Sequence, residues 1–175
     1  SEWGKADITR VAMGHTVSVT ALQMLNMLCC IGNDGVLLKP HLVRRVVGKD
    51  GVVLLDNKPE VVAQPISAAT AKLVRNMLVA VTREGGTGTR AAVKGFNVAG
   101  KTGTAEKMQD GRYAANQNIV SFMGVLPAER PEIGIIVVLD NPHPMYTGSM
   151  SAAPVFARIA EAAVRHLGIR EDDPD

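Results

Sequence analysis

The stretch Val98-Ala-Gly-Lys-Thr-Gly-Thr-Ala-Glu-Lys107 decides how the rest of the sequence is interpreted. It places a cation, two hydroxyls and two glycines within five residues, in a segment that begins like a β-strand. Two apolar segments follow it, 119–125 and 133–139, and short connections with turn residues such as Asp110-Gly111 separate the three. Three strands joined in this way predict an antiparallel meander whose first strand runs from about Phe96 to Thr104.

Two helical patterns precede this predicted meander. Thr20-Ala-Leu-Gln23 is a capping-box pattern, and apolar residues at helical spacing then predict a mostly buried helix that stops at Gly32. Ser67 can cap a second helix that ends at Gly85-Gly86. On that helix we expect Leu73, Val74, Met77, Leu78 and Val81 to share one face, with Lys72 and Arg75 on another.

A third helix is predicted after the last strand, over 151–167, with Gly168 as its stop and Val155, Phe156, Ile159, Ala163 and Val164 pointing inward. Because segment 133–139 is continuously apolar, helices should cover both faces of the sheet. Residues 36–38, 42–47 and 52–55 look extended, with a turn at 49–51, and residues 1–15 suggest a short helix or turn. The fold class predicted from these patterns is α+β.

Composition excludes several classes of function. The 175 residues suit one domain or a large part of one, and 46% of them are hydrophobic. The net charge is only +2 and the basic residues form no run, so we expect no nucleic-acid partner. The four histidines are too dispersed to predict a metal site, and nothing indicates a cofactor. Cys29 and Cys30 are adjacent in a helical pattern, which predicts small core residues rather than a disulfide.

A nucleotide-binding P-loop is one alternative for the central stretch, because Gly95, Gly100, Lys101 and Thr102 have its spacing. A P-loop needs a strand that enters its first glycine and a helix that begins at its lysine, since the phosphate binds at the helix N-terminus. The sequence offers neither context, because Gly103 and, soon afterwards, Asp110-Gly111 leave no room for a helix. We therefore disfavour this alternative.

The chemistry of the Lys-Thr-Gly-Thr segment, 101–104, follows from its residue types. Lys101 can attract a carboxylate and relay a proton, and the hydroxyls of Thr102 and Thr104 can bind that carboxylate. Gly103 would let a substrate backbone approach, and an outward amide of Thr104 could face an oxyanion. On a regular strand Lys101 and Gly103 point to one face and the threonines to the other, so a twist or bulge would be needed to aim all of them at one ligand. Solvated residues of an edge strand remain the competing interpretation.

Six stretches together resemble the C-terminal half of the transpeptidase domain of class B penicillin-binding proteins. In order they are Met13-Gly-His-Thr-Val-Ser-Val-Thr20, Asn33-Asp-Gly-Val-Leu-Leu-Lys-Pro-His41, Gly85-Gly-Thr-Gly-Thr89, Val98-Ala-Gly-Lys-Thr-Gly-Thr-Ala105, Ser121-Phe-Met-Gly124 and Ala152-Ala-Pro-Val-Phe156. Lys-Thr-Gly alone is a weak signal, but it belongs to a motif set of penicillin-binding proteins. The loop from Asp140 to Gly148 also resembles the family's connection before its C-terminal helix.

The resemblance implies a β-lactamase/transpeptidase-like fold and a parent D,D-transpeptidase that cross-links peptidoglycan stem peptides through a serine acyl-enzyme. Such an enzyme binds β-lactams, needs no cofactor or metal, serves cell division or elongation, and works with other cell-wall synthesis proteins. It lies in the cell envelope, outside the cytoplasmic membrane, on an anchor that this chain lacks. Lys101 and Thr104 would then be catalytic, and Thr102, Gly103 and Thr104 would bind the substrate.

The sequence departs from the family in one respect: it contains no Ser-x-x-Lys and no Ser-x-Asn, and Thr104-Ala-Glu-Lys107 has no serine. We therefore expect residues 1–175 to be the C-terminal part of the domain, starting after the nucleophile motifs, with an incomplete sheet. Such a fragment alone should be inactive, and its uncovered apolar face should cause dimerisation or poor solubility. The alternative is a non-catalytic anion- or peptide-binding module derived from the same fold.

Overall fold

The structure is a computed structural model that describes residues 17–109 and 112–172. The helix or turn predicted over 1–15 and the turn at Asp110-Gly111 lie outside these residues. Among the described residues, none of the helices is both long and apolar enough to span a bilayer.

A three-stranded antiparallel sheet forms the centre of the fold, in the order β5-β6-β7. Its strands are β5 (Ala99–Gln109), β6 (Arg112–Leu126) and β7 (Ile133–Asp140). This is the predicted meander, with the first two strands longer than expected. Thr102 pairs with Phe122, and Phe122 pairs in turn with Val137. Strand β5 therefore lies at one edge of the sheet, and β6 lies in the middle.

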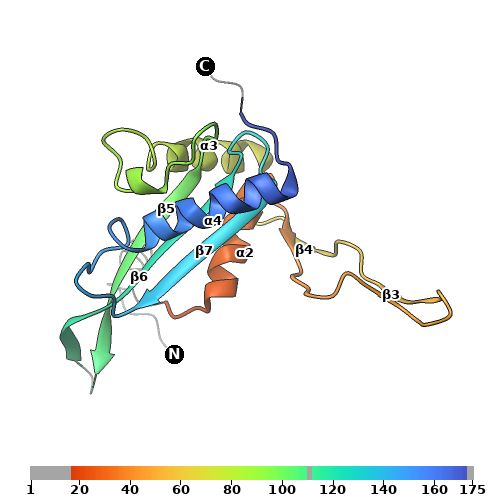
Figure 1. Cartoon of the computed structure of the whole chain (residues 1–175), viewed down its shortest axis with the longest axis horizontal. Coiled ribbons are helices and arrows are strands. Elements are labelled where there is room, and N and C mark those ends of the chain that lie inside the picture. Colours follow the sequence, from red (N-terminus) through yellow and green to blue (C-terminus); the bar gives the residue numbers. More distant parts are fainter. Residues whose placement is uncertain (1–16, 110–111, 173–175) are drawn as a thin grey trace.

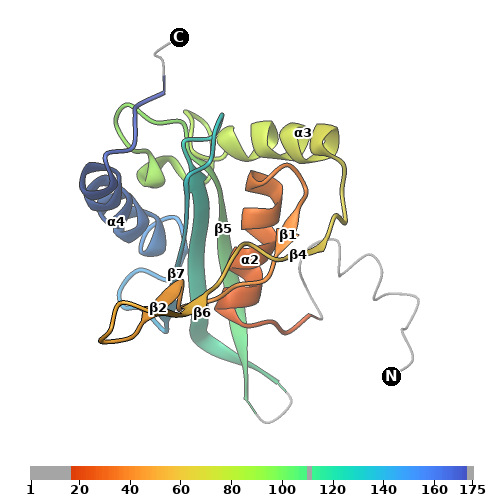
Figure 2. The same ribbon diagram turned by 90° about the vertical axis from the view of Figure 1, so that its right-hand side faces the viewer.

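Helices cover both faces of this sheet, as predicted (Figure 2). Helix α4 (Ala152–Leu167) packs on one face, where the rings of Phe122 and Phe156 meet edge to face at 4.7 Å. Helix α2 (Ala21–Gly32) packs on the other face and places Leu28 among buried residues of the sheet. Helix α3 (Ala68–Val79) packs beside α2 and against β5. The result is the predicted α+β layer structure.

The helix boundaries follow from local capping chemistry. Thr20 and Gln23 form the reciprocal capping box at the start of α2, and the hydroxyl of Ser67 accepts the amide of Thr70 at the start of α3. Gly168 ends α4 in the left-handed conformation, with φ of 65°. The sequence predicted these three signals correctly.

The second helix differs from its prediction in length and in its buried face. It ends at Val79, and a turn region and the short 3-10 helix η1 (Thr89–Ala91) follow, so Gly85-Gly86 does not terminate it. Arg75, expected on a polar face, is 6% exposed, whereas Leu73 and Met77 are more than half exposed. Arg75 is buried because its guanidinium donates to the carbonyl oxygens of Ile31 and Gly32 and to the carboxylate of Asp34.

The other two helices are less buried than expected. On α2 only Leu28 and Cys30 are fully buried, and Leu22 and Met27 are about half exposed. On α4 Phe156 and Val164 point inward as predicted, but Val155 and Ile159 are 37% and 45% exposed. Both helices thus have apolar side chains that the described residues do not cover.

Two small antiparallel pairs stand apart from the main sheet. Strand β1 (Leu37–Leu38) pairs with β4 (Val61–Ala63), and β2 (Arg45–Val47) pairs with β3 (Val53–Asp56). The second pair extends away from the helices and the central sheet (Figure 1). The sequence predicted the extended segments of β1, β2 and β3 but did not predict β4.

Candidate functional site

The Lys-Thr-Gly-Thr segment lies in a regular part of the edge strand β5. Its pairing with β6 runs without a shift from Ala99 to Glu106, and a bulge occurs only between Glu106 and Met108. The alternation expected for a strand therefore holds across 101–104. Lys101 and Gly103 share the face toward α2 with Ala99, which packs with Leu28. The bulge that could have aimed all the polar side chains to one face is absent from 101–104.

This geometry excludes the P-loop interpretation. Lys101 and Thr102 lie inside β5, which continues to Gln109, so no helix N-terminus stands at Lys101 to bind a phosphate. The residues between Gly95 and Gly100 form a short bridge at Phe96 and then enter the strand.

The ammonium group of Lys101 lies at the free edge of β5. Its Nζ donates to the carbonyl oxygen of Thr102 at 2.8 Å, and the residue is exposed. The carbonyl of Thr102 therefore faces away from β6, at the open edge of the sheet. In an antiparallel ladder every second residue of an edge strand faces outward, so the backbone N–H and C=O of Thr104 also face this edge. Lys101 forms no salt bridge with a described carboxylate, and Glu84 beside the glycine-rich loop and Glu106 on β5 are both exposed.

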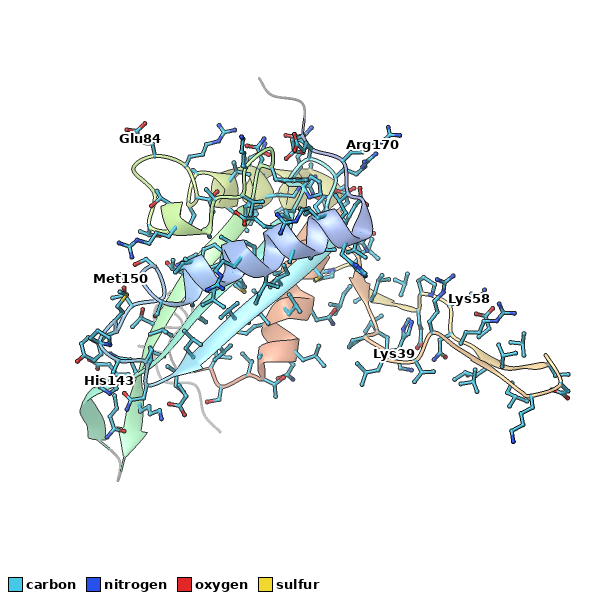
Figure 3. All side chains as sticks on the ribbon, in the orientation of Figure 1. Lys39, Lys58, Glu84, His143, Met150 and Arg170 are labelled. Carbon is cyan, nitrogen blue, oxygen red and sulfur yellow. The ribbon has the colours of Figure 1, made fainter. Side chains whose placement is uncertain are left out.

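The two threonine hydroxyls connect β5 to loops from two other parts of the chain. The hydroxyls of Thr102 and Thr87 lie 3.3 Å apart, which links β5 to the glycine-rich loop 85–89. The amide of Gly148 donates to the hydroxyl of Thr104 at 3.4 Å, which links β5 to the loop between β7 and α4. Figure 3 shows this last loop through two of its labelled residues, His143 and Met150, beyond the end of α4. The site is therefore assembled from three segments.

A close backbone approach requires glycine at position 148. A Cβ on Gly148 would overlap the carbonyl oxygen of Ser121 and stand 2.6 Å from that of Gly103. A Cβ on Gly103 would meet only the hydroxyl of Ser121 on the neighbouring strand, a side-chain group that can rotate away. The contact with Ser121 therefore does not require glycine at position 103, and the predicted role of Gly103 in admitting a substrate backbone remains a prediction. The sequence analysis did not identify Gly148 or Ser121 as part of the site, although both lie in stretches that it noted.

A buried threonine anchors the start of β5. The hydroxyl oxygen of Thr82 lies 2.8 Å from the carbonyl oxygen of Val98 and 3.1 Å from that of Val79, and its proton can be donated to either. Thr82 therefore joins the end of α3 to the residue before the strand. Thr82 is 8% exposed. The sequence analysis missed it, because a single threonine after a helical pattern carries no distinctive signal. It fixes where the Lys-Thr-Gly-Thr segment begins.

The arrangement provides an exposed cation, two hydroxyls and an open strand edge within four residues. No group of three His, Cys, Asp or Glu suited to a metal ion occurs among the residues that the structure describes. An open edge can add the backbone of an extended peptide, and a cation with hydroxyls can bind its carboxylate. The geometry is that of a peptide-carboxylate site.

Comparisons with known proteins identify the family. Residues 1–161 match the family described as penicillin binding protein transpeptidase domain. The probable peptidoglycan D,D-transpeptidase PenA of Neisseria meningitidis is 34% identical over 173 residues, 98% of this chain and 28% of the relative. The penicillin-binding protein PbpB of Mycobacterium tuberculosis is 36% identical over 169 residues, 91% of this chain and 25% of the relative.

The solved structures give the same result. The crystal structure of penicillin binding protein 3 from Mycobacterium tuberculosis complexed with ampicillin superposes with a TM-score of 0.87 at 33% identity. The match covers 99% of this chain and 40% of that one. The chain thus spans well under half the length of these relatives. The match over most of its residues, in sequence and in structure, shows that the chain belongs to the penicillin-binding protein transpeptidase domain family.

Proposed function

We propose that this chain forms the substrate-binding part of a serine D,D-transpeptidase that cross-links peptidoglycan stem peptides and is acylated by β-lactams. The observation that carries the proposal is the edge strand β5, on which Lys101, Thr102 and Thr104 border an open row of backbone groups. A stem peptide ends in an extended dipeptide with a free carboxylate. An edge strand with a cation and hydroxyls matches both of these features.

Each residue of the segment then has a distinct role. Lys101 supplies positive potential for the substrate carboxylate and can relay a proton to or from the serine. The hydroxyls of Thr102 and Thr104 donate to the carboxylate, and Gly103 lets the backbone of the bound peptide lie close to the strand. The outward amide of Thr104 donates to the oxyanion that forms when the serine attacks the carbonyl carbon. The side chain of Lys101 and the two hydroxyls project from opposite faces of β5. A ligand bound along the edge of the strand is therefore contacted by the lysine from one face and by the hydroxyls from the other.

The relatives support the enzyme over the non-catalytic module. Those described above are named a D,D-transpeptidase and penicillin-binding proteins, and one of them was crystallised with ampicillin. We accordingly infer that the parent of this chain is a cell-wall enzyme of the envelope, and that it acts with other cell-wall synthesis proteins. We infer further that residues 1–175 are the C-terminal part of its transpeptidase domain.

The serine nucleophile has to come from outside these 175 residues, which contain no Ser-x-x-Lys. We therefore propose that the isolated chain is inactive. Its exposed apolar side chains on α4, Val155 and Ile159, would then be covered in the parent or by a second copy of the chain. Sedimentation of the isolated chain should accordingly reveal dimers or larger species. A monodisperse, cooperatively melting monomer would contradict that expectation.

A labelling experiment tests the proposed function. The parent protein and the isolated chain are incubated with a fluorescent penicillin, and covalent adducts are read on a denaturing gel. The parent should be labelled at one serine, unlabelled ampicillin should block the label, and the isolated chain should stay unlabelled at low micromolar probe. If the parent neither forms the adduct nor exchanges the terminal D-alanine of a stem peptide, the transpeptidase proposal is refuted. The non-catalytic binding module is then the remaining hypothesis.

A further inference from the structure

The ribbon of β2 and β3, residues 42–58, has no function in the proposed site. It is a two-stranded sheet that extends into solvent (Figure 1), and Figure 3 shows Lys58 on it, away from the helices. All eight of its Val and Leu side chains, from Leu42 to Leu55, are between 40% and 104% exposed. Isolated two-stranded ribbons are marginally stable in water, and contiguous exposed apolar side chains mark interaction surfaces.

The ribbon nevertheless has a well-defined hairpin. The amide of Gly48 donates to the carbonyl of Val52 at 2.8 Å, and Gly51 takes the positive φ, 81°, that the turn requires. At the other end the amide of Asn57 donates to the carbonyl of Arg44 at 2.8 Å. The ladder therefore extends from Arg44 to Gly48.

The charges of the ribbon are unbalanced. Residues 42–58 contain four cations, Arg44, Arg45, Lys49 and Lys58, against two carboxylates, Asp50 and Asp56. Lys58 pairs with Asp56, and a carboxylate oxygen of Asp50 accepts the amide of Val52 in the turn. Arg44 and Arg45 are exposed and form no salt bridge with a described residue. An excess of positive charge disfavours pairing of the ribbon with a second copy of itself and favours an acidic partner.

Strand alternation decides between a membrane and a polypeptide as that partner. Arg44 and Arg45 are consecutive, so their side chains leave opposite faces of β2, and each face also carries exposed valines such as Val46 and Val47. A bilayer would require an apolar face opposite a basic one. A peptide strand added beside β2 instead places consecutive side chains on opposite faces of the ribbon. Two consecutive acidic residues can therefore lie next to Arg44 on one face and Arg45 on the other.

The free edge of β2 has the backbone groups for such an addition. The carbonyl of Arg44 and the amide of Gly48 bond inward to β3. The ladder shifts its register between Val46 and Val47, but the extra residue, Leu54, lies on β3. Strand β2 therefore keeps its alternation, which leaves the amides and carbonyls of Arg45 and Val47 facing outward. From this juxtaposition we propose that the edge of β2 binds an extended acidic and apolar segment of a partner protein as an added strand. The segment carries two consecutive Asp or Glu residues flanked by β-branched residues. The proposal is independent of the penicillin-reactive site.

The test uses the full chain and a fluorescein-labelled peptide, Ser-Val-Val-Glu-Glu-Val-Val-Ser, whose palindromic sequence can pair in either direction. Fluorescence anisotropy should show saturable binding that weakens with salt. The same peptide with Lys-Lys in place of Glu-Glu should bind at least tenfold more weakly. Absence of saturable binding, equal binding of the Lys-Lys peptide, or binding only to vesicles of anionic phospholipid would overturn the proposal.

Three variants separate charge from strand addition. Arg44→Glu with Arg45→Glu should weaken peptide binding at least tenfold, whereas Arg158→Glu with Arg165→Glu, on exposed positions of α4, should leave it unchanged. Val47→Pro keeps both arginines. Proline has no backbone N–H, so this variant loses the outward amide of residue 47 but no hydrogen bond to β3, and it should also weaken binding at least tenfold. The ribbon residues belong to neither buried cluster, so melting curves should stay superimposable. Wild-type binding in either ribbon variant would refute the proposal.

Discussion

The backbone of Gly148 lies against the backbone of Gly103, so that a Cβ on Gly148 would stand 2.6 Å from the carbonyl oxygen of Gly103. This contact holds the loop before α4 against the Lys-Thr-Gly-Thr segment. We predict that Gly148→Ala forces the loop away from β5 and costs about 1–3 kcal/mol of unfolding free energy. In the parent it should also slow acylation by penicillin. Met150→Ala, a change at an exposed position of the same loop, is the matched control for urea denaturation and for acylation.

Arg75 caps the C-terminal end of α2 from the neighbouring helix. Arg75→Ala leaves the carbonyls of Ile31 and Gly32 without their donor, so we predict a loss of about 2–3 kcal/mol in urea denaturation. Lys72→Ala, on an exposed position of the same helix, should change stability by less than about 0.5 kcal/mol. Equal midpoints for the two variants would show that the buried guanidinium does not stabilise the helix pair.

Thr82 joins α3 to the residue that precedes β5. Thr82→Val preserves the shape of the side chain but removes the donor to Val98, and we predict a loss of about 1–3 kcal/mol. Thr82→Ser keeps the hydroxyl and should retain most of that stability. If the valine variant is as stable as the wild type while the serine variant is unstable, the methyl group and not the hydrogen bond is responsible.

The sequence predicted the parts of the fold that depend on local signals. The Thr20 capping box, the Ser67 cap, the Gly168 stop and the three-stranded meander need only neighbouring residues and hydrophobic period. The buried face of α3 could not be predicted, because Arg75 is buried by carbonyls of α2, some forty residues earlier in the sequence. Helix periodicity alone therefore assigned Leu73 and Met77 to the apolar face of the helix, whereas the structure exposes both side chains.

The candidate site was predictable in its chemistry but not in its assembly. Lys101 and the two threonines were recognised because their types and spacing suit a carboxylate ligand. The contacts of Thr102 with Thr87 and of Thr104 with Gly148 depend on loop conformations that no periodic pattern encodes. The roles of 101–104 in binding and catalysis remain predictions.

The two cysteines provide a pH-dependent test of the α2 packing. Burial raises the pKa of both thiols, Cys29 and Cys30, above the ordinary value. The stability linked to this shift is fully present below the unfolded-state pKa and falls as pH rises toward the folded-state pKa. We predict that iodoacetamide modifies the folded chain more slowly than the chain in urea, with a half-maximal rate at higher pH. Cys29→Ala and Cys30→Ala assign the residual reactivity, which should come mainly from the half-buried Cys29. Equal rates for the folded and unfolded chain would contradict the packing.

The most direct test of the account is the acylation rate of the parent protein carrying Lys101→Ala. If β5 is the carboxylate and oxyanion cradle, the second-order rate constant for a fluorescent penicillin should fall by about 10²–10⁴-fold, because the proton relay and its positive potential are lost. Lys94→Ala, an exposed lysine outside the strand, should leave the rate within about twofold, and both variants should melt like the wild type. An unchanged acylation rate in a folded Lys101→Ala variant would contradict the account.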